Sequence, residues 1–207
     1  MELQNRNRRS IRLKGYDYTQ AGGYFVTICT QNRKCLFCDI VNRKIVLNDA
    51  GEMIKKWYME LENKYPGIQC GEMITMPNHI HFIINIVNAK NPSAGTDLRV
   101  SPFPNEMEQY MGEHTGSPLH CVIQWFKTMT TNEYIRGVKS FNWERFCKRL
   151  WQRNYYEHII RDDNEYDRIV WYIRRNPEKW NDDRLNDKTK NLLMEPIAEY
   201  GAEPWMI

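Results

Sequence analysis

Hydrophobic and polar residues alternate most regularly between Glu72 and Val87, which is the most strand-like stretch of the chain. Successive side chains of a β-strand point to opposite faces, so this alternation predicts a strand with two different sides. One side is uniformly apolar and consists of Ile80, Phe82, Ile84 and Ile86. The other side carries His79, His81, Ile83 and Asn85. We expect the apolar side to anchor the strand in a core while the two imidazoles lie together on the other side.

Similar patterns predict the remaining elements. Stretches rich in β-branched and aromatic residues predict strands, and apolar residues spaced three and four positions apart predict helices. Strands are expected at 24–30, 68–76 and 149–161, with a short hairpin at 40–47. Helices are expected at 48–64, 118–134 and 165–175. The pair Pro77-Asn78 is expected to form a tight turn that places His79 at the start of its strand.

The order strand, helix, strand, strand, helix, strand, with a further helix appended, is that of a ferredoxin-like α+β unit. We expect an antiparallel sheet with helices on one face, whose other face is free for a ligand. Residues 22–180 would form this domain, with an exposed insertion at 88–117. Residues 1–21 are a basic N-terminal arm, and residues 181–207 are an acidic C-terminal tail with six acids and three bases.

The composition favours a cytoplasmic protein with a single core. The chain has 207 residues, of which 42% are hydrophobic and 27% charged, and no apolar stretch is long enough to span a bilayer. The basic residues near the start are not followed by the apolar run of a signal peptide. The six cysteines are therefore expected to be reduced thiols, and the Cys35–Cys38 pair is interpreted as two ordinary thiols because no second such pair follows.

Positive charge is concentrated in two places. The N-terminal arm contains Arg6, Arg8, Arg9, Arg12 and Lys14 against one acid, Glu2. A second cluster, with Arg145, Lys148, Arg149 and Arg153, is interleaved with the aromatic residues Phe146, Trp151, Tyr155 and Tyr156. Basic and aromatic side chains together suit phosphates and unstacked bases, although each cluster alone could be a solvated surface. Their coexistence favours a nucleic-acid partner, and Lys127 is a further candidate for a phosphate contact.

The histidine strand and the last helix carry the candidate chemistry. His79 and His81 can converge on one metal ion, although such a pair also occurs by chance on half-exposed strands. On the 165–175 helix, Tyr172 lies at the edge of the apolar stripe and Asn176 follows one turn later. This arrangement would present a phenol and an amide oxygen together, but a tyrosine at such an edge is also an ordinary packing residue.

Three ordered motifs resemble the single-tyrosine HUH transposases of the IS200-like superfamily, and among them the REP-associated tyrosine transposases. The motifs are Pro77-Asn78-His79-Ile80-His81, Trp151-Gln152-x-x-Tyr155-x-Glu157-His158-x-Ile160-Arg161 and Tyr172-Ile173-x-x-Asn176-Pro177. The resemblance implies His79, His81 and Asn176 as ligands of Mg²⁺ or Mn²⁺ and Tyr172 as the nucleophile. His158 matches a motif position without an assigned role and is a candidate auxiliary base.

The resemblance also implies an activity. It implies a transposase that cuts and rejoins single-stranded or hairpin DNA, with a metal ion and a 5′-phosphotyrosine intermediate. A non-catalytic regulator that binds hairpin nucleic acid is the alternative. A zinc hydrolase built on His79 and His81 would lack a recognisable third ligand. The sequence leaves open whether a monomer closes its own site or a homodimer shares its sites.

Overall fold

A computed structural model describes residues 21–87 and 118–186 of the chain. The expected arm residues 1–20, the insertion 88–117 and the tail from 187 onward lie outside these residues, so the expectations about them stay predictions. The described helices are α1 (Asp49–Lys64), α3 (Pro118–Ser140) and α4 (Asp163–Arg175), with short 3₁₀ segments η1 (Gln31–Arg33) and η2 (Asn176–Asp182). The strands are β1 (Gly22–Cys29), β2 (Cys38–Val41), β3 (Lys44–Leu47), β4 (Ile68–Thr75), β5 (His79–Ile86) and β6 (Tyr156–Ile160).

Four strands form one antiparallel sheet in the order β4-β5-β1-β6. The two inner strands are therefore β5, which carries the histidines, and β1. With β2 and β3 set apart as a separate hairpin, this strand order and the α+β element order confirm the predicted ferredoxin-like fold. In the register of β1 and β5, Thr27 is opposite His81 and Cys29 is opposite His79, so these side chains share one face of the sheet.

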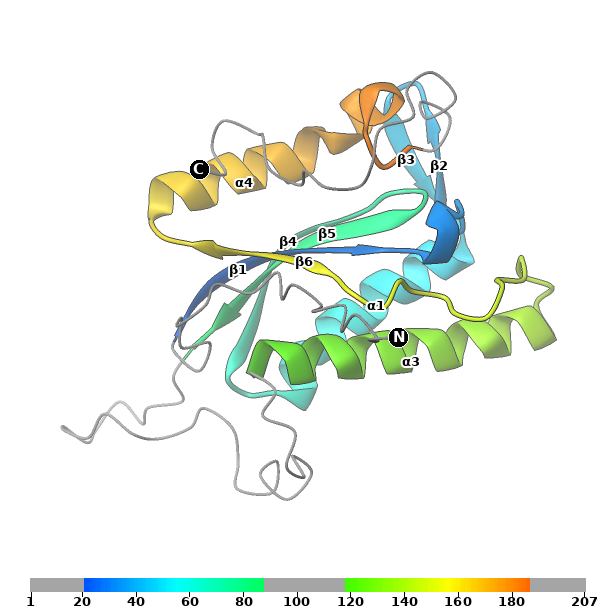
Figure 1. Cartoon of the computed structure of the whole chain (residues 1–207), viewed down its shortest axis with the longest axis horizontal. Coiled ribbons are helices and arrows are strands. Elements are labelled where there is room, and N and C mark those ends of the chain that lie inside the picture. The colour runs from blue at the N-terminus through cyan, green and yellow to red at the C-terminus, as the bar shows by residue number, and fades with distance from the viewer. Residues whose placement is uncertain (1–20, 88–117, 187–207) are drawn as a thin grey trace, which may run out of the picture.

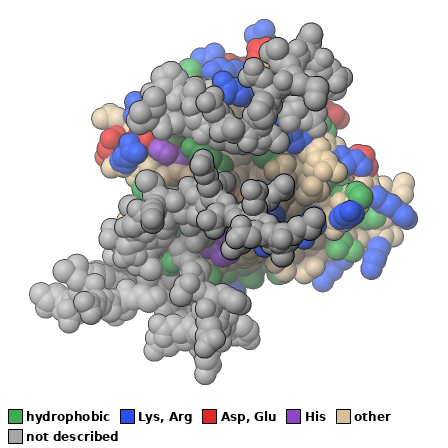
Figure 2. All heavy atoms as spheres, viewed as in Figure 1, with side chains coloured by type: hydrophobic (Ala, Val, Ile, Leu, Met, Phe, Trp, Pro, Cys, Tyr) green, Lys and Arg blue, Asp and Glu red, His purple; other side chains and the backbone are tan. Residues whose placement is uncertain are grey.

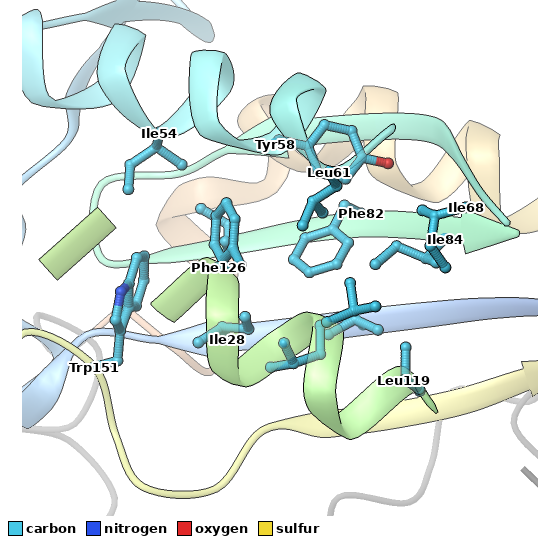
Figure 3. Close-up of a cluster of buried hydrophobic side chains, with 14 of the residues drawn as sticks. Ile28, Ile54, Tyr58, Leu61, Ile68, Phe82, Ile84, Leu119, Phe126 and Trp151 are labelled. Carbon is cyan, nitrogen blue, oxygen red and sulfur yellow. The ribbon is translucent and has the colours of Figure 1, made fainter. Parts of the chain in front are cut away.

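The other face of the sheet packs on α1 and α3 and forms the larger core. Figure 1 shows these two helices together below the sheet. The predicted apolar side of β5 lies in this core, where Phe82 contacts Phe126 of α3 and Tyr58 of α1 (Figure 3). Tyr58 also donates a hydrogen bond from its hydroxyl to the Ile83 carbonyl, so a polar atom in this core is satisfied.

Helix α4 covers the histidine face of the sheet, so the expectation that this face is free for a ligand is wrong (Figure 1). A smaller apolar cluster joins Ile169 and Ile173 of α4 to Phe25 and Ile83 of the sheet. The physical reason is the apolar stripe of α4, which is buried by packing against the apolar side chains on this face of the sheet. The helix begins where the Asp162 side chain accepts a hydrogen bond from the Glu165 N–H at 2.8 Å.

Two predicted boundaries differ from the structure. The last strand covers only Tyr156–Ile160, because the chain before it is held in an irregular path in which Lys127 donates to the carbonyls of Gln152 and Arg153. Helix α3 continues past the predicted end at residue 134 to Ser140. Gly137 allows this continuation, since the Trp143 ring packs where a β-carbon of residue 137 would lie.

None of the helices within residues 21–87 and 118–186 has both the length and the apolar character needed to cross a bilayer.

Candidate functional site

The histidine pair lies at the start of β5, on the face of the sheet that α4 covers. His79 is 0% and His81 2% exposed, and their Nε2 atoms are 3.0 Å apart. The Pro77-Asn78 turn fixes this end of the strand, since the Met76 N–H donates to the His79 carbonyl at 2.9 Å. The two imidazoles are thus held rigidly together by an inner strand, as the alternation pattern predicted.

The hydrogen bonds of Asn78 determine which nitrogen of His79 carries the proton. The Asn78 amide nitrogen donates to the carbonyls of Arg33 at 3.1 Å and Leu185 at 2.7 Å, so its Oδ1 is directed at His79 Nδ1, 2.8 Å away. Because Oδ1 can only accept, His79 carries its hydrogen on Nδ1 and a lone pair on Nε2.

The tautomer of His81 then follows from that of His79. His81 Nε2 donates to the lone pair of His79 Nε2, and the Thr27 hydroxyl, 2.7 Å from His81 Nδ1, donates to that nitrogen. Binding of a cation by both Nε2 atoms requires the His81 hydrogen to be on Nδ1, where it donates to Thr27 Oγ1. A hydroxyl can take either role, so Thr27 supports both tautomers.

Burial keeps both imidazoles neutral. Desolvation lowers the pKa of His81 to about 3, and desolvation followed by the nearby His81 and the Arg33 charge lowers the pKa of His79 well below its ordinary value. The contact of 3.7 Å between His79 Nε2 and Asp183 Oδ2 is therefore not an ion pair, because a neutral imidazole with its hydrogen on Nδ1 carries no charge and no hydrogen on Nε2. Neutral imidazoles are the form that binds metal ions.

Tyr172 of α4 lies against the histidine pair. Its ring centroid is 5.4 Å from that of His81 and 6.0 Å from that of Phe25, and it is half-buried. The neighbouring Ile169 and Ile173 bury the stripe of α4 and so set the rotation of the helix about its axis. The structure therefore brings together the predicted nucleophile and the predicted histidine ligands, which precede it in the chain by 93 and 91 residues.

Asn176 lies at the end of α4, where the helix passes into η2. The residue is 4% exposed, and among the described residues its side-chain Oδ1 has no hydrogen-bond partner. A buried acceptor without a donor is costly, and a cation would satisfy it. This observation fits the predicted role of Asn176 as an oxygen ligand.

The spacing of the histidines fits a small divalent cation. In octahedral coordination at roughly 2.1 Å, adjacent ligand atoms are about 3.0 Å apart, which is the distance between the two Nε2 atoms. Within the described ranges, no three His, Cys, Asp or Glu side chains are positioned as they stand to hold an ion. The amide of Asn176 is the third ligand that the resemblance implies, and this role stays a prediction.

Other predicted site residues lie elsewhere. Lys127 is on α3, on the opposite side of the sheet, and two of its three N–H donors bind carbonyls. Arg149 and Arg153 are exposed residues of the segment that joins α3 to β6, and the Arg153 carbonyl accepts from Lys127 at 3.1 Å. Figure 2 shows Lys and Arg side chains gathered at the right-hand end of the view. His158 shares the sheet face of the histidine pair, but its Nε2 is 2.9 Å from Glu165 Oε1, which orients the ring. Their proposed roles stay predictions, and Arg6, Arg8, Arg9, Arg12 and Lys14 lie outside the described residues.

Sequence reasoning missed three residues that surround the histidines, namely Thr27, Asn78 and Asp183. Asn78 was assigned only to the turn, and Asp183 to the acidic tail. The carbonyls of Arg184 and Leu185 instead accept hydrogen bonds from Arg33 and Asn78, and Leu185 and Asn186 are buried. Thr27 would have required the register of β1 on β5, which alternation alone does not give.

Comparisons with known proteins find relatives in sequence and in fold. An uncharacterized protein of Haemophilus influenzae is 36% identical to the chain over 179 residues, which cover 86% of this chain and 93% of the relative. A second protein of the same organism, named "Putative REP-associated tyrosine transposase", is 26% identical over 79% of this chain and 74% of its own length. No family model matches the chain.

A solved structure of a REP-associated tyrosine transposase bound to a REP hairpin has the same fold. It superimposes with a TM-score of 0.50 over 92% of this chain and 95% of that one, at 16% identity. The similarities in sequence and fold confirm the resemblance implied by the motifs and support a transposase-like function. The chain therefore belongs to the family of its 36%-identical Haemophilus influenzae relative, and it resembles the REP-associated tyrosine transposases in both sequence and fold.

Proposed function

We propose that the protein is a metal-dependent single-strand DNA endonuclease and strand transferase that acts on REP-like hairpin DNA through a 5′-phosphotyrosine on Tyr172. The observation that carries this proposal is the contact between Tyr172 and His81, with ring centroids 5.4 Å apart. It places a phenol beside two neutral imidazoles whose Nε2 atoms face each other. The contact is made within one chain, so the proposal needs no histidines from a second subunit.

The chemistry is a phosphoryl transfer to tyrosine. Tyr172 Oη attacks the phosphorus of a single-stranded phosphodiester, the bond to the 3′ oxygen breaks, the phenol loses its proton and the departing oxygen gains one. A Mg²⁺ or Mn²⁺ ion held by His79, His81 and Asn176 would offset the negative charge on the phosphate and on the departing oxygen. A second 3′-OH can attack the phosphotyrosine in the reverse direction, so cleavage and rejoining need no external energy source.

The chain's own residues position these groups. The inner strand β5 fixes the imidazoles, Asn78 sets the tautomer of His79, and Thr27 holds His81 in either tautomer. The apolar stripe of α4 sets the direction in which Tyr172 points. An unperturbed phenol has a pKa near 10, so Tyr172 must be activated at the site. His158, oriented by Glu165, is a candidate auxiliary base on the same sheet face.

The proposed partner is hairpin DNA with a single-stranded segment. The similar solved transposase was bound to a REP hairpin, and this chain has exposed Arg149 and Arg153 together with the basic arm. Backbone contacts of this kind give salt-dependent affinity. A regulator that binds such hairpins without cutting them is the alternative, and it predicts binding that persists in EDTA with no cleavage.

The test is formation of a covalent protein–DNA adduct. Purified protein is incubated with Mn²⁺ and labelled REP-like hairpins, and adducts are separated on denaturing gels. The wild type and Tyr166→Phe are expected to form the adduct, because Tyr166 lies on the same helix as a packing residue. Tyr172→Phe and EDTA are expected to abolish it. An adduct that persists in Tyr172→Phe would contradict the nucleophile assignment.

A further inference from the structure

Asp183 lies beside the histidine pair. Its Oδ2 is 3.7 Å from His79 Nε2, and the side chain is 14% exposed. Its Oδ1 accepts a hydrogen bond from the Leu185 N–H at 2.7 Å, and its backbone carbonyl accepts one from the Asn186 N–H at 2.9 Å. A compact turn therefore holds the carboxylate with one oxygen directed toward His79.

The turn of Asp183 and the histidine pair share a support. Asn78 orients His79 through its Oδ1 and, through its amide nitrogen, donates at 2.7 Å to the carbonyl of Leu185. Leu185 is 7% exposed, so this turn is part of the packed domain. A shift of the Asp183 backbone relative to His79 would have to disturb buried hydrogen bonds, whereas a small rotation of the side chain would leave them in place.

The contact between Asp183 and His79 brings two electron-rich atoms together. His79 Nε2 carries a lone pair, because its hydrogen is on Nδ1, and the Asp183 oxygen carries negative charge when ionised. A cation between the two atoms would convert this repulsion into attraction.

The ligand preference of the cation also favours a carboxylate at this site. Mg²⁺ and Mn²⁺ prefer oxygen ligands, and carboxylates above all, whereas two imidazoles and an amide form a neutral set. An approach of roughly 0.7 Å would bring Asp183 Oδ2 from 3.7 Å to the spacing of about 3.0 Å expected for adjacent octahedral ligands. Rotation of an aspartate side chain can supply a movement of this size.

We propose that Asp183 is a carboxylate ligand of the metal ion bound by His79 and His81, so that the site carries a net negative charge before the ion binds. This inference rests on the proposed function, since it concerns the same metal site. It assigns a binding role to a residue that follows the last motif and that the sequence placed in the tail.

The test measures Mn²⁺ affinity directly, by electron paramagnetic resonance titration of the free ion. Asp183→Asn is the main variant, because its amide oxygen can still accept from Leu185 N–H while the charge is lost. Asp182→Asn, at an exposed neighbouring position, is the matched control for the loss of one negative charge. Asp183→Asn is expected to weaken Mn²⁺ binding at least tenfold, and Asp182→Asn is expected to change it less than twofold.

Asp183→Glu separates coordination from a general effect of charge. It keeps the carboxylate but moves its oxygens by one methylene group, so a direct ligand predicts weakened binding, whereas a long-range field predicts wild-type affinity. Circular dichroism of each variant verifies that the fold is retained. Wild-type affinity in either Asp183→Asn or Asp183→Glu would overturn the proposal.

The same experiments distinguish this inference from the proposed function. In the first case, the wild type binds Mn²⁺ and forms the Tyr172 adduct, and Asp183→Asn binds the ion as tightly as the wild type. The ligand role of Asp183 is then refuted, and the proposed function stands. If Asp183→Asn and Asp183→Glu bind weakly but no hairpin yields an adduct, the ligand role is supported and the function fails. A wild type that binds no Mn²⁺ would refute both.

Discussion

The hydrogen bond between Thr27 and His81 offers a sharp test of how the site is oriented. Thr27 is 6% and His81 2% exposed, and Thr27 Oγ1 is 2.7 Å from His81 Nδ1. Thr27→Val removes the hydroxyl and leaves the buried nitrogen without this partner, which costs roughly 1–3 kcal/mol of stability. Thr27→Ser keeps the hydroxyl and loses one methyl group, which costs about 1 kcal/mol.

The two variants should differ more in metal affinity than in stability. Loss of a hydrogen-bond partner behind a histidine ligand typically weakens metal binding about 10–100-fold, so Thr27→Val should weaken Mn²⁺ binding within that range. Thr27→Ser should remain close to the wild type. A tenfold loss of affinity reduces the stabilisation by saturating Mn²⁺ by about 1.4 kcal/mol.

The assay is urea unfolding of the wild type and both variants, with and without Mn²⁺. The difference between the two conditions isolates the binding contribution from the direct cost of each substitution. The reasoning is refuted if Thr27→Val and Thr27→Ser gain the same stabilisation from Mn²⁺ as the wild type. It is also refuted if Thr27→Ser loses as much of the Mn²⁺ stabilisation as Thr27→Val, because the methyl group would then be responsible.

Two further predictions concern stability. Burial lowers the pKa of His81 to about 3, so from pH 6.5 down toward 3 the unfolded chain binds a proton that the folded chain does not. The free energy of unfolding should therefore be highest above pH 6.5 and fall by a few kcal/mol on acidification. The urea midpoints of the wild type and of His81→Gln should diverge across this pH range. Parallel midpoint curves would contradict the lowered pKa of His81. Gly137→Ala should destabilise the protein by roughly 1–3 kcal/mol, because the added β-carbon would overlap the Trp143 ring. At an exposed helical glycine the same substitution would instead stabilise the protein by about 1 kcal/mol. The sign of the stability change in thermal unfolding therefore shows whether Trp143 occupies the space beside residue 137.

The elements that the sequence predicted well are those in which one local pattern determines the structure. The period of two in β5 assigned each side chain to its face, because a strand between two layers must bury two different surfaces. The starts of α1 and α4 were predicted to within two residues, and at these starts Asn48 and Asp162 each accept from a backbone N–H three residues on.

The features that could not be predicted depend on how distant segments meet. The apolar stripe of α4 showed that this helix packs on something, but not that it covers the histidine face. The pairing of Thr27 with His81 depends on the β1–β5 register, and alternation fixes only the face. Asp183 lacked any local signal, because its place beside His79 results from a turn held by Asn78, more than 100 residues earlier.

The two faces of the sheet carry apolar clusters of different size. The histidines and Tyr172 therefore belong to regions that differ in local stability. The histidines belong to an inner strand backed by the large cluster that α1 and α3 complete, whereas α4 is held by a few buried side chains. Amide hydrogens of β5 should exchange with solvent only when the whole domain unfolds, while those of α4 can exchange through separate opening of the helix. Tyr172 could thus leave and return to an intact pair of imidazoles, which would let a DNA strand reach the buried face without unfolding the sheet.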